Sequence, residues 1–283
     1  MKINFIKMQG LGNDFILIDC INKSLGDSSF LSYLAKKLCH RNFGIGADGL
    51  ILILPSSQAD LKMRIFNADG TEAQMCGNGI RCFAKYAYEN NLVTKNKFTV
   101  ETLAGIIIPE LIITKRQISG IKVNMGTPRL RRKEIPMSGK DTPTVVNEEL
   151  EINPGQTFKI TAVSMGNPHC VISVDEVKAI AVSKIGPQIE NHPLFPEKTN
   201  VEFIQVLNRR EINCRVWERG VGETLACGTG ACAALVAGVL TNQTDHQATV
   251  HLPGGDLEIE WAEDGKVYMT GPAELVFKGE ISI

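Results

Sequence analysis

The sequence has few aromatic residues, almost no net charge and no long apolar run. Its 30 basic and 31 acidic side chains nearly cancel, and the only strongly basic stretch is the short Arg129–Lys133, which argues against a nucleic-acid partner. No segment approaches the roughly 20 apolar residues of a membrane span. Met1-Lys2-Ile3-Asn4-Phe5 also lacks the apolar run of a signal peptide. We therefore expect a cytoplasmic protein with neither a nucleic-acid nor a membrane partner.

What the sequence does contain is typical of a globular protein rich in turns: 43% hydrophobic residues and 26 glycines in 283 residues. This length is enough for two domains, each with its own core. The eight cysteines are scattered through the chain, which excludes the dense disulfide framework of a small secreted protein. We expect six of them to be ordinary reduced, buried thiols: Cys20, Cys39, Cys82, Cys170, Cys214 and Cys232.

The sequence repeats short patterns at a nearly constant offset. Cys76-Gly77-Asn78-Gly79 matches Cys227-Gly228-Thr229-Gly230, and four other pairs follow the same order along the chain. Together they predict a duplicated unit: an N-terminal lobe of residues 1–126, a C-terminal lobe of residues 127–272, and a leftover strand over residues 273–283 that returns to the first lobe. The other pairs are Gly12-Asn13 with Gly166-Asn167, Arg64-Ile65-Phe66 with Arg215-Val216-Trp217, Val100…Gly105 with Val250…Gly255, and Lys122–Met125 with Lys266–Met269.

Both halves have the hydrophobic pattern of α/β structure. Helical spacing of apolar residues covers Leu31–Leu38, Ile80–Ala87 and Ala231–Leu240, and the last two follow a Cys-Gly-x-Gly directly. The polar, proline-containing stretch Arg129–Gln156 is expected to cross irregularly between the lobes. Alternating or β-branched segments predict strands at Ile51–Leu54, Leu61–Phe66, Phe98–Glu101, Ile118–Asn124, Glu202–Val206, Ile212–Trp217, Ala248–Leu252 and Leu257–Trp261.

The two cysteine loops suggest a specific chemistry. A Cys-Gly-x-Gly turn that leads into a helix places the thiol and free backbone N–H groups at the positive end of the helix dipole. That position favours a thiolate and can hold a carboxylate. If the lobes are related by a pseudo-twofold axis, Cys76 and Cys227 would flank one ligand. Inversion of an amino-acid α-carbon needs such a pair, because one base removes a proton and an acid on the opposite face delivers another.

A metal site and a redox pair are the two alternative interpretations of the cysteines. The spacings Cys76-x5-Cys82 and Cys227-x4-Cys232 do not match zinc knuckles, and neither loop contains histidine, so we expect no metal site. A binding or redox-sensing protein, in which Cys76 and Cys227 form a reversible disulfide, stays open on the sequence alone.

Five ordered motifs resemble the signatures of the diaminopimelate epimerase family. The resemblance covers essentially the whole chain and implies a PLP-independent interconversion of LL- and meso-diaminopimelate on the bacterial route to lysine and peptidoglycan, with no cofactor. It also implies an α/β fold of two pseudo-symmetric lobes, each a curved, mostly antiparallel sheet around a central helix. The motifs are Gly10–Phe15, Phe66–Gly70, Cys76–Cys82, Ser164–His169 and Glu218–Gly230.

The resemblance also implies roles for individual residues. Cys76 and Cys227 would be the acid–base pair, His169 and Glu218 would tune the thiol pKa values, and Tyr268 would take part in forming a homodimer. A hydrogen-bonded histidine that only stiffens the Asn167-Pro168 turn is the alternative for His169. The small-molecule amino-acid substrate would be bound by Asn13, Asn67, Gly77, Asn78, Asn167, Asn200, Glu218, Arg219, Gly228 and Thr229.

The sequence departs from the family pattern at two positions. The family commonly has histidine where this chain has Gln9, and glutamine at a ligand-contacting position where this chain has Gly49. We interpret both as local adjustments of the pocket. A proline or hydroxyproline racemase of the same superfamily is the alternative enzyme, but those usually carry a histidine in the first cysteine loop, where this chain has Asn78.

Overall fold

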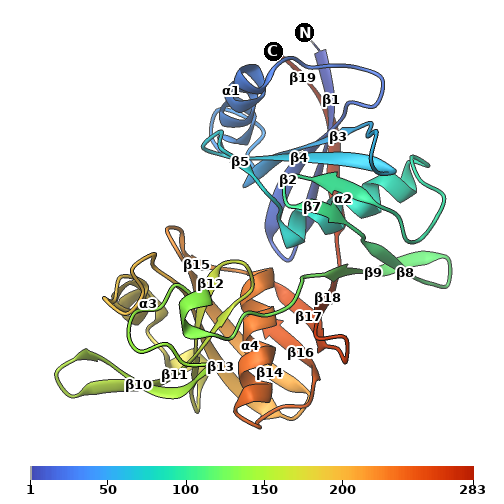
Figure 1. The fold of residues 1–283 in the computed structure, drawn as a ribbon. Coiled ribbons are helices and arrows are strands. Elements are labelled where there is room, and N and C mark those ends of the chain that lie inside the picture. The colour runs from blue at the N-terminus through green and yellow to red at the C-terminus, as the bar shows by residue number, and fades with distance from the viewer. Residues whose placement is uncertain (1) are drawn as a thin grey trace. The chain divides into compact units, whose positions relative to one another are not determined.

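The computed structural model describes residues 2–283, which form two compact units. The N-terminal unit runs through Asn124 and includes Thr270–Ile283, and the C-terminal unit is Met125–Met269. Each unit is an α/β structure, and the predicted fold class is confirmed (Figure 1). No helix within residues 2–283 is long and apolar enough to cross a membrane.

The N-terminal unit is built on a mixed, mostly antiparallel sheet in the order β19-β1-β2-β3-β4-β6-β7, with β5 paired to β4. The parallel pairs are β2 with β3 and β4 with β6. The C-terminal strand β19 lies beside β1 at the edge of this sheet (Figure 1). The elements are β1 (Lys2–Gly10), β2 (Asn13–Asp19), α1 (Ser28–Cys39), β3 (Gly49–Leu54), β4 (Leu61–Asn67), β5 (Glu72–Ala73), α2 (Gly77–Glu89), β6 (Val100–Thr102), β7 (Gly105–Ile107), β8 (Glu110–Thr114), β9 (Gln117–Asn124) and β19 (Glu274–Ser282).

The C-terminal unit repeats this plan strand for strand. In it β12 pairs parallel with β13 and β14 with β16, whereas β13 with β14, β14 with β15 and β16 with β17 are antiparallel. The elements are η1 (Arg132–Glu134), β10 (Val145–Asn153), β11 (Gln156–Ser164), β12 (Pro168–Ser173), η2 (Val177–Ala179), α3 (Val182–Glu190), β13 (Asn200–Asn208), β14 (Glu211–Glu218), β15 (Gly222–Thr224), α4 (Gly228–Leu240), β16 (Gln247–Leu252), β17 (Gly255–Trp261) and β18 (Val267–Gly271).

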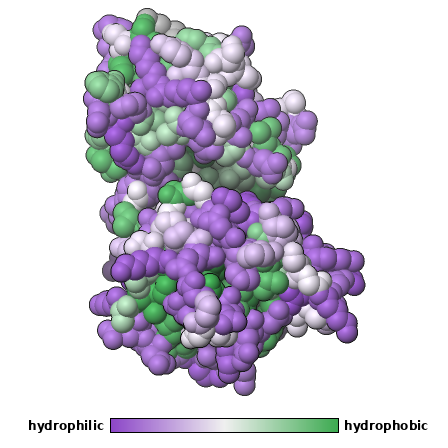
Figure 2. All heavy atoms as spheres, turned by 90° about the vertical axis from the view of Figure 1, so that its left-hand side faces the viewer, coloured by the Kyte–Doolittle hydropathy of each residue, from purple (hydrophilic) through white to green (hydrophobic). Residues whose placement is uncertain are grey.

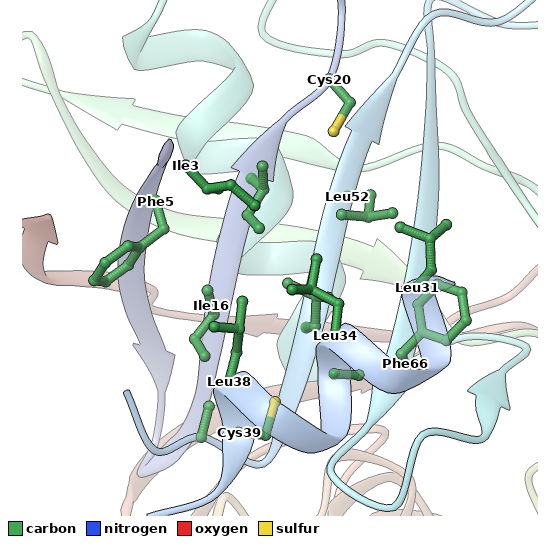
Figure 3. Packing of buried hydrophobic residues seen from close by; sticks show 14 residues of the cluster. Ile3, Phe5, Ile16, Cys20, Leu31, Leu34, Leu38, Cys39, Leu52 and Phe66 are labelled. Carbon is green, nitrogen blue, oxygen red and sulfur yellow. The ribbon is translucent and has the colours of Figure 1, made fainter. Parts of the chain in front are cut away.

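Helices cover both faces of the central strands. Strand β3 is buried at five successive positions because α1 packs on one face and α2 on the other. Figure 3 shows the α1 side, where Leu31, Leu34 and Leu38 point from the helix onto Ile16 and Leu52 of the sheet. Cys20 and Cys39 belong to the same cluster, as expected for core thiols. Hydrophilic residues cover most of the face seen in Figure 2, with apolar residues showing in patches.

In the C-terminal unit α3 and α4 take the places of α1 and α2. Alternate residues Val201 and Phe203 of β13 join the α3-side cluster, so Glu202 between them points toward α4. Helix α4 is apolar all round, and its residues Gly230–Gly238 are buried. The six cysteines predicted to be core thiols are all free and at most 3% exposed.

Two parts of the sequence prediction need correction. The stretch Arg129–Gln156 is not irregular throughout, because it contains η1 and the nine-residue strand β10, which pairs with β11. Its many polar residues are the exposed side of an edge strand whose Val145 and Leu150 are buried. Helix α3 was missed because Gly186 and Pro187, both unfavourable inside a helix, interrupt its pattern.

Candidate active site

Each unit places one glycine-flanked cysteine at the start of a buried helix. Cys76 is the N-cap of α2 and Cys227 is the N-cap of α4, and the two helices have the same length of 13 residues. The backbone of the two caps is nearly the same, with φ −139° and ψ 124° at Cys76 against φ −124° and ψ 114° at Cys227. Backbone N–H groups at the first turn of a helix attract anions. Both loops therefore combine a thiol with an anion-attracting backbone.

Cys227 is 6% exposed and lies among polar groups of the C-terminal unit. Burial raises the pKa of its thiol well above the ordinary value, and the carboxylates of Glu218 and Glu202 raise it further. A hydrogen bond with Thr229 and the backbone N–H of Gly230 act in the opposite direction. The Sγ of Cys227 is 3.5 Å from Oγ1 of Thr229. The environment of this sulfur thus favours the neutral thiol.

Glu218 lies at the end of β14 in the same group of side chains. Burial raises the pKa of its carboxyl, whereas hydrogen bonds with Thr224 and Cys227 oppose that change. The hydroxyl of Thr224 donates to Glu218 Oε1 at 2.5 Å. A carboxyl whose pKa is raised beside a thiol is an arrangement typical of acid–base sites.

His169, on β12, is completely buried and hydrogen-bonded at both ring nitrogens. Nδ1 is 2.7 Å from Glu202 Oε1, and Nε2 is 3.1 Å from Asn167 Oδ1. The amide nitrogen of Asn167 donates to Thr229 Oγ1 over 3.3 Å. The structure therefore links His169 to the loop of Cys227 through Asn167 and Thr229.

Asn200 and Glu190 hold the turn that carries Arg219. Asn200 donates to the carbonyl of Pro168 at 2.9 Å and accepts from the backbone N–H of Arg219 at 2.9 Å, so both ends of its buried amide are occupied. Glu190 accepts from the backbone N–H of Gly220 at 2.9 Å and from Trp217 Nε1 at 2.7 Å. The exposed guanidinium of Arg219 donates to the carbonyl of Glu197 at 2.9 Å.

In the N-terminal unit, Asn13 lies beside Cys76. Its Oδ1 is 3.7 Å from the Cys76 sulfur and accepts from Asn78 Nδ2 at 3.2 Å. Its Nδ2 donates to Asp48 Oδ2 at 2.7 Å. The buried guanidinium of Arg81 donates to Asn78 Oδ1 at 2.9 Å and to the carbonyl of Gly77 at 3.1 Å. Three of the predicted site residues, Cys76, Asn13 and Asn78, thus form one hydrogen-bonded group.

The two positions that depart from the family pattern have clear local surroundings. Gln9 accepts from the backbone N–H of Gly12 at 2.8 Å and donates to Glu274 at 2.9 Å. At Gly49 a Cβ atom would lie 2.9 Å from the carbonyl oxygen of Phe66 and 3.4 Å from the ring of Phe15. Any side chain at position 49 would therefore require the backbone to shift.

Two predicted residues lie apart from these hydrogen-bonded groups. Asn67 is exposed at the end of β4, where its amide donates to Thr71 Oγ1 at 2.9 Å. Tyr268, on β18, donates to Asp264 at 2.9 Å in the same unit. Their roles in substrate binding and dimerisation remain predictions.

Sequence reasoning missed three charged residues of the site: Asp48, Arg81 and Glu202. Arg81 and Glu202 are 0% exposed, and both could have been suspected from their positions. Arg81 lies in the helix that follows the first cysteine loop, and Glu202 lies in an otherwise apolar stretch of a predicted strand. Within residues 2–283 no group of three His, Cys, Asp or Glu side chains is arranged to hold a metal ion.

These features define an α/β protein made of two like-folded units, each with a cysteine at the N-terminus of its buried helix. Solved structures show the same fold: a phenazine biosynthesis protein of Bacillus anthracis has a TM-score of 0.72 at 17% identity over all of both chains. A hydroxyproline epimerase of Agrobacterium vitis has a TM-score of 0.69 at 12% identity, over 99% of this chain and 91% of that one. At these identities the likeness concerns the fold alone.

Sequence comparison is more specific. Residues 5–131 and 161–276 match the profile of the diaminopimelate epimerase family. Diaminopimelate epimerase of Moorella thermoacetica is 57% identical over 99% of this chain and 100% of its own, and that of Pelotomaculum thermopropionicum is 58% identical over 98% of each. The chain belongs to the diaminopimelate epimerase family.

Proposed function

We propose that this protein interconverts LL- and meso-2,6-diaminopimelate without PLP, with Cys76 and Cys227 as the acid–base pair. The observation that carries the proposal is the repeated cap geometry: in a chain of this family, both cysteines occupy the N-cap of a buried helix and precede a glycine. One sulfur as thiolate removes the α-proton, and the other as thiol delivers a proton to the opposite face. The reverse reaction exchanges their roles.

The helix N-termini supply the electrostatic part of this mechanism. Negative charge grows on the substrate carboxylate as the α-proton leaves. Backbone N–H groups of Gly77 and Asn78 in one loop, and of Gly228 and Thr229 in the other, suit that charge because they lie at the positive ends of α2 and α4. Preorganised donors of this kind need no rearrangement during the reaction.

The remaining predicted residues suit a substrate with two amino-acid ends. Arg219 can bind a carboxylate with its planar guanidinium, and Glu218 can accept from an ammonium group. Glu218 and His169 are assigned a role in tuning the thiol at position 227, which the effect of the Glu218 carboxylate on the Cys227 pKa supports. Asn13, Asn67, Asn167 and Asn200 complete the proposed binding set.

We place the reaction in lysine and peptidoglycan-precursor synthesis in the cytoplasm, and we propose a homodimer. Strand β19 supports the homodimer because it is the edge of its sheet and exposes Leu275, Val276 and Phe277 by 46%, 53% and 46%. An exposed apolar edge strand is a surface that another chain can cover. The contribution of Tyr268 to that contact is part of the same proposal.

The experiment that tests the function is NMR detection of deuterium at the α-carbon. LL-diaminopimelate and, separately, proline are incubated with reduced protein in D2O without PLP, beside the Cys76→Ala and Cys227→Ala variants. We expect exchange and epimerisation of diaminopimelate alone, lost in both variants. Turnover of proline would assign the protein to the racemases instead, and inert substrates would favour a binding or redox role for the thiols.

A further inference from the structure

Glu202 is a buried carboxylate that the reaction described above does not use. It lies on β13 with 0% exposure, between two strands of the sheet and under the first turn of α4. Its Oε2 has no hydrogen-bond partner in the part of the chain that the structure describes. Burying a carboxylate with an unpaired oxygen costs stability. A residue that served packing alone would be better replaced by an apolar one, so a function for Glu202 is indicated.

The other carboxylate oxygen of Glu202, Oε1, determines which ring nitrogens of His169 carry a proton. Nε2 of His169 faces Asn167 Oδ1, a hydrogen-bond acceptor, and must therefore carry a proton. Nδ1 faces Glu202 Oε1 at 2.7 Å, and that contact holds a second proton, either on the ring or on the carboxyl. Histidine and carboxylate together thus keep Nε2–H pointed at Asn167.

From His169 the hydrogen bonds continue, each donor pointing to the next acceptor, as far as the sulfur of Cys227. Asn167, held by its oxygen, presents its amide N–H to Thr229 Oγ1 at 3.3 Å. The Thr229 hydroxyl, which then has its own proton free to donate, is 3.5 Å from the Cys227 sulfur. Every donor in the series His169, Asn167 and Thr229 can therefore point toward Cys227. Chains of hydrogen bonds that share one direction polarise one another.

The N-terminal unit shows the opposite arrangement. Asn13 is the repeat counterpart of Asn167, and its amide nitrogen is held by Asp48 at 2.7 Å. Its oxygen is consequently the group that faces the Cys76 loop, where Asn78 donates to it at 3.2 Å. The two equivalent asparagines thus present opposite ends of their amides to the two cysteine loops, and a carboxylate anchors each orientation.

We propose that Glu202 is a positioning residue of the reaction: through His169 it sets the amide orientation of Asn167 and directs a chain of donors onto the Cys227 sulfur. In this way it makes the two cysteine loops of the repeat chemically different. The inference rests on the proposed function for its effect on turnover, but the state of His169 can be measured without any substrate.

The first turn of α4 is shaped to admit this carboxylate. A Cβ atom on Gly230 would lie 2.7 Å from Glu202 Oε1 and 3.4 Å from the Cys227 sulfur. Glycine at position 230 therefore allows the carboxylate and the sulfur to share the space at the start of the helix. The partial positive charge of the helix N-terminus favours a carboxylate there.

The direct test is 15N NMR of the histidine rings in the substrate-free protein labelled at histidine, with the signals of His169 assigned by their loss in His169→Gln. We expect a proton on Nε2 and a proton shared at Nδ1 in the native protein. In Glu202→Gln the side-chain amide should donate to Nδ1, so that Nε2 keeps its proton and Nδ1 loses its own. An unprotonated Nε2 in the native protein would overturn the proposal even if the epimerase activity is confirmed.

The second test asks whether Glu202 acts through His169. We expect Glu202→Gln to lower kcat about tenfold, with a smaller change in KM, because the donors keep their direction but the hydrogen bond to His169 loses the negative charge that strengthens the series. In the His169→Gln background the same substitution should have little further effect, because residues that act as one unit are not additive. If the two substitutions multiplied their effects on kcat in the double variant, Glu202 would not act through His169, and the proposal would be wrong.

The matched control is Ile204→Val, which removes one methyl group from the same face of β13 without touching a polar group. It should keep kcat and the His169 spectrum. If Glu202→Gln lowered kcat only in proportion to a fall in melting temperature and left the His169 spectrum unchanged, as a purely destabilising variant would, then Glu202 would be a structural residue and the proposal would be wrong.

Discussion

Cys227 and Glu218 influence each other's ionisation: beside the effect of burial, the negative charge of Glu218 raises the pKa of the Cys227 thiol, and the thiol lowers the pKa of the Glu218 carboxyl. Burial makes the larger contribution to this shift, and the carboxylate adds to it. The pair is therefore most stable with Cys227 protonated. An epimerase with two thiols needs one of them in this state and the other as thiolate before each turnover.

We expect Glu218→Gln to lower the pKa of Cys227, because removing the adjacent negative charge favours the thiolate. In a Cys76→Ser background, the pH at which Cys227 reacts half-maximally with iodoacetamide should fall by about one unit. Mass spectrometry of the peptide that contains Cys227 measures this over a pH series. An unchanged or higher midpoint would show that the Glu218 charge does not act on the sulfur.

The control for this substitution is Glu223→Gln. Glu223 lies on neighbouring β15 but pairs with Arg215, whose Nε donates to it at 2.9 Å. Its charge is compensated there, so this variant should keep the alkylation midpoint of Cys227.

Asp14 should contribute to stability at neutral pH and lose that contribution in acid. Burial alone would raise the pKa of its carboxyl, but Arg41 and Lys7, the latter 2.6 Å away, lower it from 3.8 to about 2. The carboxylate is therefore fully stabilising above pH 3.8 and stops being so as the pH falls through about 2. Asp14→Asn should lower the free energy of unfolding at pH 7 by about 2 kcal/mol.

Urea denaturation between pH 2 and pH 7 checks this prediction. The native protein should lose stability more steeply than Asp14→Asn as the pH falls below 4, because the variant has no carboxylate to protonate. Asp141→Asn is the control: Asp141 is exposed beside Arg131, and exposed ion pairs contribute little. Parallel pH curves for the native protein and Asp14→Asn would contradict the assignment.

Gly186→Ala should destabilise the C-terminal unit, although alanine is the better helix former by about 1 kcal/mol. A Cβ atom at position 186 would lie 2.5 Å from Cγ of Trp217, and the half-buried indole cannot move away without breaking its hydrogen bond to Glu190. Overpacking of this kind costs about 1–3 kcal/mol, which exceeds the gain in propensity. Thermal unfolding followed by tryptophan fluorescence should show a lower midpoint.

The same substitution should also raise KM, because Glu190 holds the turn that carries Arg219. Lys184→Ala, at an exposed position of the same helix, is the control and should keep both the midpoint and KM. A Gly186→Ala protein as stable as the native one would mean that Trp217 has space to shift.

Arg81→Lys should impair the first cysteine loop. The buried guanidinium donates to Asn78, to the carbonyl of Gly77 and to the carbonyl of Pro272 at 3.0 Å, and a lysine ammonium cannot reach all three with its different geometry. We expect kcat/KM to fall about tenfold or more, together with the melting temperature. The control is Lys85→Arg: Lys85 pairs with Glu89 on the same helix, so this variant should change neither kcat/KM nor the melting temperature.

Local sequence patterns predicted the parts of the fold that depend on periodicity. The helices after Cys76 and Cys227 and the central strands β3, β4, β13 and β14 follow from apolar spacing, because packing on both sheet faces demands it. The internal repeat extends further than the matched motifs: Arg64 binds Glu72 at 2.7 Å, and Arg215 binds Glu223 in the same way in the second unit.

The sequence predicted less where tertiary contacts override local preference. Strand β10 carries mostly polar residues and is held by its pairing with β11, and α3 contains Gly186 and Pro187 but is held by packing on β13 and β14. Neither element would be stable alone, so neither has a strong local signal.

The sequence by itself determined the duplicated plan, the family and the two cysteine loops, because glycine turns, apolar periods and motif order are written locally in the chain. Only the tertiary structure decided how the two loops differ. Asp48 and Glu202 are distant in sequence from the asparagines they control, and their effect depends on strand pairing that brings a carboxylate within hydrogen-bond distance of Asn13 in one unit and of His169 in the other. Hydrogen-bond direction is a property of such contacts, and no local pattern encodes it.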